Sequence, residues 1–123
     1  MRLEDLQIYQ IAMVLGENVW QLVETWGYWE KDTFGKQMIR AADSVAANLA
    51  EGFGRYHIKE NINFCYYSRG SLKETVTWLV KAFNRNLILK EKFEELTQLC
   101  NTISVKLNNY IKTLRNPNFV ISK

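Results

Sequence analysis

The sequence predicts an all-α fold, an antiparallel, up-down-up-down four-helix bundle. Apolar residues recur at intervals of three and four along four long segments, which is the spacing of one face of a helix. The single proline, Pro117, lies near the end of the 123-residue chain, so it interrupts none of these segments. The connections between the segments are short. We therefore expect one domain at residues 1–116, with helices at about 3–26, 33–53, 59–85 and 91–115, and a tail at 117–123.

The first helix carries more apolar surface than one bundle contact requires. Two apolar stripes run along it in parallel, and both step by three and four residues. One stripe suffices to dock the helix in its own bundle, so the second predicts contact with another subunit. Burial of both stripes within one chain is the alternative interpretation. The residues expected at the subunit interface are Tyr9, Met13, Trp20, Val23 and Trp26.

The second helix is rich in alanine, serine and glycine. Small side chains on several of its faces let other helices approach closely, which predicts a central position in the bundle. Gly27 is expected to end the first helix, and Asp32 or Thr33 to cap the second after a loop. Two glycines, Gly52 and Gly54, mark the end of the second helix.

The third and fourth helices, 59–85 and 91–115, each show one regular apolar seam. Arg69 is the one charged residue in the seam of the third helix. The connector at 86–90 is short, so these two helices should be antiparallel neighbours. The tail leaves the last helix at Pro117, and it either docks on the bundle or on a neighbour, or frays.

Polar residues interrupt the second and third helices, and we expect some of them to form a structural network. Antiparallel packing brings Glu51 within reach of Arg69, and this pair would be bidentate and partly desolvated. The network would fix helix register. An anion site at Arg55, His57, Lys59 and Arg69 is the alternative. The residues assigned to the network are Asn48, Glu51, Arg55, Arg69, Ser71 and Glu74.

Charge is unevenly distributed along the chain. The formal net charge is +3, but residues 1–30 carry −4 and the remainder +7. After Glu95 every charged residue is basic. This asymmetry is compatible with an anionic partner, RNA or DNA above all, and equally with an ordinary solvated surface. Tyr56, Tyr66 and Tyr67 offer stacking surfaces, although core positions are favoured for them. The candidate nucleic-acid contacts are Lys36, Arg40, Lys73, Lys81, Arg85, Lys106, Lys112 and Arg115.

Nothing in the sequence predicts an enzyme, a metal site or a cofactor. His57 is the one histidine and has no second ligand at metal-binding spacing. Cys65 and Cys100 match neither a zinc site nor a redox pair, and both fall on apolar stripes. No apolar run is long enough to span a bilayer, and the N-terminus lacks the pattern of a signal peptide. We therefore expect a cytoplasmic protein with no membrane partner.

Two blocks of sequence carry a family resemblance. The block from Ser44 to Arg55 reads SVAANLAEGFGR, and the block from Tyr67 to Glu74 reads YSRGSLKE. Together with Leu6 and Tyr9 near the start of the chain they resemble the four helix bundle protein family, small bacterial proteins encoded within intervening sequences of large-subunit ribosomal RNA genes. Ser68 stands where alanine is common in that family.

The resemblance covers nearly the whole chain, and it implies a ring-like homo-oligomer, a pentamer. It also implies kinship with the accessory proteins of diversity-generating retroelements, which bind nucleic acid and a reverse transcriptase. It implies no catalytic activity. We therefore expect a non-enzymatic homo-oligomeric scaffold that binds RNA or DNA electrostatically. A protein–protein interaction module with no nucleic-acid binding is the alternative, and a small-ligand or enzymatic role would need a polar pocket between the second and third helices.

Overall fold

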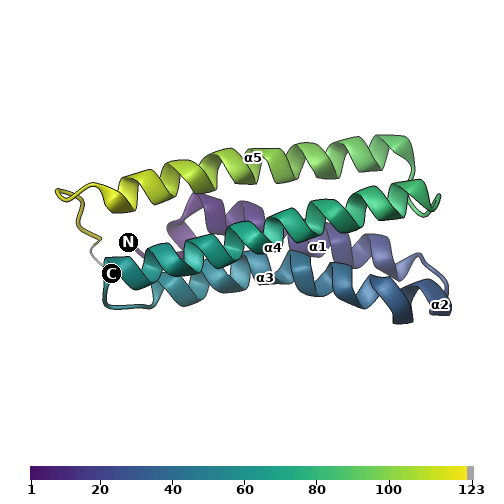
Figure 1. The fold of residues 1–123 in the computed structure, drawn as a ribbon, viewed down its shortest axis with the longest axis horizontal. Helices are drawn as coiled ribbons and strands as arrows, with labels where there is room; N and C mark the ends of the chain where they lie inside the picture. Colours follow the sequence, from purple (N-terminus) through teal and green to yellow (C-terminus); the bar gives the residue numbers. More distant parts are fainter. Residues whose placement is uncertain (122–123) are drawn as a thin grey trace.

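The computed structural model describes residues 1–121 and is helical throughout its regular elements, which confirms the predicted all-α class (Figure 1). Within the described residues no strand is present. Three short helical turns accompany four long helices. The short turns are η1 (Leu3–Asp5), α2 (Tyr28–Glu30) and η2 (Lys31–Gly35), and the long helices are α1 (Gln7–Glu24), α3 (Lys36–Phe53), α4 (Ile58–Asn84) and α5 (Lys90–Arg115).

The four long helices pack side by side in the cyclic order α1, α3, α4, α5 (Figure 1). Neighbouring helices run in opposite directions, as pairs of contacting residues show. Between α1 and α5, Lys92 donates to Asn18 and Lys106 to Gln7. Between α3 and α4, the Ser68 hydroxyl donates to the Val45 carbonyl over 2.8 Å, and Gly52 lies against Asn61. In both pairs the residue numbers rise along one helix as they fall along the other. In this order, the groove between α1 and α3 lies on the opposite side of the bundle from the groove between α4 and α5.

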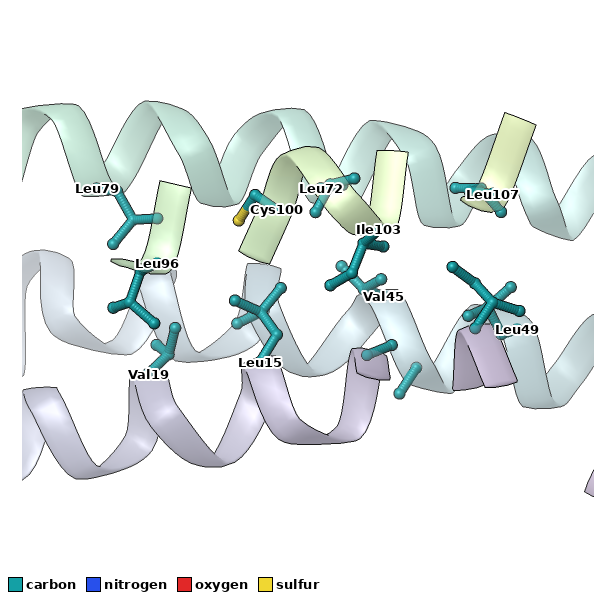
Figure 2. Packing of buried hydrophobic residues seen from close by; sticks show 14 of the residues in the cluster. Leu15, Val19, Val45, Leu49, Leu72, Leu79, Leu96, Cys100, Ile103 and Leu107 are labelled. Carbon is teal, nitrogen blue, oxygen red and sulfur yellow. The ribbon is translucent and has the colours of Figure 1, made fainter. Parts of the chain in front are cut away.

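The core is built from the predicted seams of all four long helices (Figure 2). Leu15 and Leu49 are almost completely buried, and each such side chain contributes about 1.5–3 kcal/mol relative to exposure. The small residues of α3 allow close contact with α4. At the end of α3, a Cβ added to Gly52 would lie 2.7 Å from Oδ1 of Asn61. The alanine-rich α3 packs against α1 and α4, and since each long helix has two neighbours in this order, the expected central position is not found.

The prediction of a loop at residues 27–33, between the first two long helices, is wrong. Gly27 has extended backbone angles (φ −71°, ψ 167°) and precedes a helical run that begins at Tyr28, passes through the π-helical η2 and continues into α3. Asp32 and Thr33 therefore lie within the helical run rather than at its cap. Asp32 forms an ion pair with Lys36 at 2.8 Å, and the Thr33 hydroxyl donates to the Trp29 carbonyl at 2.7 Å.

The α4–α5 connection is short, as predicted, and it ends α4 with a Schellman motif. Asn86 adopts a left-handed conformation (φ 60°). Its N–H donates to the Phe83 carbonyl, and the Leu87 N–H donates to the Ala82 carbonyl. In the tail, Phe119 and Ile121 pack against the core, whereas residues 122–123 lie outside the described part of the chain. No described helix is long and apolar enough to cross a membrane.

Candidate nucleic-acid interface

Six polar and basic side chains follow the groove between α4 and α5, and we call this set the α4/α5 polar face. On α4 they recur at intervals of three and four residues, which places them on one side of the helix. On α5 they recur every seven residues, two helical turns apart. The face consists of Tyr66, Arg69 and Lys73 from α4 and Asn101, Asn108 and Arg115 from α5.

The centre of this face is a tyrosine ring contacted by two guanidinium groups. The Cζ atom of Arg69 lies 4.9 Å from the centroid of the Tyr66 ring, and that of Arg115 lies 5.6 Å from it. Arg69 also donates from Nη1 to Oδ1 of Asn108 across the groove, over 3.2 Å. Since a guanidinium has five N–H donors, both arginines keep donors that no described residue uses. This is the donor geometry that suits phosphate oxygens.

The α4/α5 groove continues past Arg69 as a hollow of about 210 Å³. Lys73, Asn101 and Ser104 line it, and its floor is apolar, with Leu72 and Cys100 both buried. Burial raises the pKa of the Cys100 thiol to about 12, so this sulfur stays protonated and unreactive at neutral pH. The hollow therefore offers hydrogen-bond donors and one ammonium group, and its thiol is not an available nucleophile.

None of the described carboxylates neutralises the cations of this face. The ion pairs of the described residues involve other cations, such as Lys36 and Arg55. Glu74 is the nearest carboxylate along α4, but it accepts a hydrogen bond from Nε1 of Trp78 over 3.1 Å, on the side of α4 that faces Phe34. Along α5, every charge beyond Glu95 is positive. The face therefore combines positive charge with neutral polar groups.

The predicted Glu51–Arg69 pair is wrong. Glu51 instead forms an ion pair with Arg55 one turn later on its own helix, at 2.9 Å. Arg69 lies on the side of α4 that faces α5, where Asn108 and Tyr66 hold it. Helical rotation places the two partners on different sides of the α3–α4 pair.

The other members of the predicted network also make local contacts. Asn48 donates to the Ser44 carbonyl over 2.9 Å, and the Ser71 carbonyl accepts from the Thr75 hydroxyl over 2.8 Å. These bonds span one helical turn each. The six residues therefore form no shared network. Arg55 stacks on Phe64 at 4.9 Å, which ties the end of α3 to the start of α4.

The eight predicted nucleic-acid contacts do not form one surface. Lys73 and Arg115 belong to the α4/α5 polar face, and Lys112 lies one turn before Arg115. The other five lie elsewhere. Lys36 and Arg40 are on α3, where the hydrogen bond that Lys36 donates to the Asp32 carboxylate raises the pKa of Lys36. Lys81 and Arg85 are at the end of α4, with Arg85 over the Phe34 ring, and Lys106 donates to Gln7 of α1 over 3.1 Å.

The five residues predicted at a subunit interface, on α1 and just after it, also differ in how deeply they are buried. Val23 and Trp26 are buried in the core, so their assignment to a subunit interface is wrong. The Trp26 ring packs 5.0 Å from that of Phe34, and its Nε1 donates to the Leu87 carbonyl over 2.9 Å. Tyr9 is half-buried. Met13 and Trp20 remain exposed, at 45% and 49%.

The sequence reading missed several surface features. Tyr56 and Tyr67 were expected in the core but are exposed, and so is Trp29 in the segment read as a loop. The contact of Tyr66 with Arg69 had a sequence signal, because the two residues are three apart in a helix. The contact between Arg69 and Asn108 had none, since it depends on how α4 and α5 are rotated. Among the described residues, no three metal-ligating side chains come together.

Comparisons with known proteins agree with this fold. Residues 4–109 match the sequence pattern of the 23S rRNA-intervening sequence protein family. A crystal structure of a protein of unknown function from the S23 ribosomal protein family of Bacteroides thetaiotaomicron has the same fold, with a TM-score of 0.77 at 19% identity over 85% of this chain and 98% of that one. No curated protein matches the chain. The family match spans most of the sequence, and the chain therefore belongs to the 23S rRNA-intervening sequence protein family.

Proposed function

We propose that this protein is a non-enzymatic, homo-oligomeric scaffold that binds RNA or DNA through the α4/α5 polar face. The observation that carries the proposal is the juxtaposition of Arg69, Arg115 and Lys73 without a described carboxylate partner. An unpaired surface cation gains most from an anionic ligand, and the ligand with a regular row of anions is a nucleic-acid backbone.

Binding of this kind reads phosphates rather than bases. The guanidinium groups of Arg69 and Arg115 already lie against the Tyr66 ring, so the ring is a poor stacking platform for a base. Each subunit offers about three or four phosphate contacts, which is weak alone. A ring or other oligomer repeats the face, and linked weak sites gain affinity through effective concentration. Self-association and nucleic-acid binding therefore support each other.

The proposed contact between copies lies on α1, opposite the α4/α5 polar face. Met13 and Trp20 are exposed there. Met13 borders a groove of about 310 Å³ between α1 and α3 that Ala46 and Ala47 line, and Trp20 borders a second groove of about 360 Å³. Small side chains allow a second helix to approach closely. Changing Trp20 to glutamate should dissociate the oligomer without unfolding the subunit, and sedimentation of the variant at unchanged mass would remove α1 from the interface.

The test of nucleic-acid binding is a titration against fluorescent structured RNA and duplex DNA at about 50 and about 200 mM salt. Lys73→Gln combined with Arg115→Gln should weaken binding to both probes and lower the slope of log K against log salt by about two. The matched control is Lys36→Gln combined with Arg40→Gln, which removes the same charge from α3. Equal losses in the two double variants would contradict the assignment to the α4/α5 polar face.

A second candidate function is docking of a protein partner with no nucleic acid involved. The observation in its favour is a group of exposed aromatic residues at the α2 end of the bundle. Tyr28 and Trp29 are 81% and 72% exposed, and Tyr28 lines a largely apolar groove of about 360 Å³ together with Trp20 and Ile39. Wild-type protein that binds neither probe at low salt, and whose Trp29→Ser variant loses a co-purifying protein, would support this function instead.

A further inference from the structure

Gly70 is a glycine that the fold of the chain does not require. It lies in the interior of α4 on the exposed side, and a Cβ built on it would meet nothing within 4 Å. Two other helical glycines have packing reasons within the chain: a Cβ on Gly35 would collide with Val23, and one on Gly52 with Asn61 and Cβ of Phe64, whereas one on Gly16 would meet only the mobile carboxylate end of Asp43. Glycine in a helix interior is less stable than alanine. Glycine at residue 70 therefore lowers the stability of the chain, and no packing contact within the described residues requires it.

The surroundings of Gly70 are those of the α4/α5 polar face. Arg69 precedes it and Lys73 follows it by three residues, so the two cations flank the bare stretch of main chain. They are four residues apart, which is about 6 Å along the helix axis. Tyr67 is exposed on the preceding turn, and Glu74 is turned toward Trp78. Around the axis of α4, Gly70 is about 60° from Lys73 and about 100° from Arg69, so a strand that leaves the groove over the outside of α4 passes both cations and then Gly70.

We propose that Gly70 is the point where the sugar–phosphate backbone of a bound nucleic acid approaches the main chain of α4, held by Arg69 and Lys73 on either side. This inference rests on the proposed nucleic-acid function and specifies its contact. A side chain at residue 70 would hold the strand away from the helix and lengthen both charged contacts. Contact with the sugar–phosphate backbone does not depend on the base sequence, so the site recognises RNA or DNA as a polyanion and discriminates little between sequences.

The test uses Gly70→Ala and Gly70→Leu in the full chain, with Thr77→Leu as the matched control. Thr77 is exposed on the same side of α4, two turns further on, and it lies outside the α4/α5 polar face. Affinity for the RNA and DNA probes at low salt, the unfolding temperature and the mass in solution are recorded for each variant. Gly70→Ala should raise the unfolding temperature and lower the affinity for both probes by about tenfold, which is the effect of losing one charge-assisted contact. Gly70→Leu should lower the affinity for both probes further, and Thr77→Leu should leave it unchanged.

Each other outcome overturns the inference in a recognisable way. A raised unfolding temperature with unchanged affinity for both probes means that Gly70 has no role in binding. A fall in mass for Gly70→Leu assigns the bare surface to a second copy of the chain instead. Wild-type protein that binds neither probe at low salt refutes the proposed function itself, and with it the role of Gly70.

Discussion

Replacing Gly52 with alanine tests the closest contact between α3 and α4. The added Cβ would lie 2.7 Å from Oδ1 of Asn61, 2.8 Å from Cβ of Phe64 and 3.1 Å from the Asn61 carbonyl oxygen. Carbon atoms pack best at about 3.5–4.0 Å, so the overlap approaches 1 Å. Asn61 cannot easily move away, because it is buried and its amide donates to the Tyr110 hydroxyl over 3.3 Å. The two helices must therefore separate.

The expected cost follows from two opposing effects. Overpacking against main-chain and Cβ atoms costs about 3 kcal/mol, at the upper end of the usual range, and the better helix propensity of alanine returns about 1 kcal/mol. The net loss of about 2 kcal/mol corresponds to a fall in unfolding temperature of roughly 6–10 °C for a chain of this size. Thermal unfolding followed by circular dichroism, at one fixed protein concentration, measures it.

The matched control is Gly54→Ala, two residues later. A Cβ there would make only ordinary contacts, 3.6 Å from the Glu51 carbonyl and 3.7 Å from that of Ala50, and the backbone φ of −76° suits alanine. Gly54→Ala should therefore leave the unfolding temperature within about 2 °C of wild type. If Gly52→Ala behaved like Gly54→Ala, the close contact between α3 and α4 would be refuted.

Three further predictions concern a helix end, the corrected ion pair and a carboxyl group. Asn86→Gly should stabilise the fold by up to about 1 kcal/mol in urea unfolding, because glycine adopts φ 60° without strain. Glu51→Gln and Arg69→Met should add within about 0.5 kcal/mol in a double-mutant cycle, because these side chains do not touch; a larger coupling energy would restore the pair. Burial, and secondarily Glu17, raises the pKa of Asp43, so ionisation opposes folding above its usual pKa of 3.8. Asp43→Asn should therefore raise the unfolding temperature at pH 7 and not at pH 3.

The sequence predicted the helices well where periodicity was the deciding signal. The expected bounds of 59–85 and 91–115 differ from α4 and α5 by one residue at most, because one regular seam runs through each. The prediction failed at 27–33, where turn-like residues indicated a loop. There the Phe34 ring packs 5.0 Å from Trp26 and 5.9 Å from Trp78, and these tertiary contacts hold the segment helical.

The candidate site was harder to predict for a geometric reason. A helical sequence gives the angle of each side chain around its own axis, but not the rotation of that axis relative to its neighbours. For this reason Arg69 of α4 was paired with Glu51 of α3, whereas it contacts Asn108 of α5. Lys106 and Lys112 share a helix with Arg115, yet Lys106 bonds Gln7 of α1. Spacing along the chain identifies candidate cations, and only packing decides which of them share a face.

The positions of the two proposed surfaces have a consequence for assembly. Because the helices follow the cyclic order α1, α3, α4, α5, a partner seated at Met13 and Trp20 leaves the opposite α4/α5 polar face open. The two sides also differ in charge: Glu17 and Asp43 border the α1/α3 groove, whereas Arg69 and Lys73 border the α4/α5 groove. A polyanion is repelled from the first side and attracted to the second. Self-association through α1 would therefore multiply the proposed phosphate-binding faces without covering them, which is the arrangement that avidity requires.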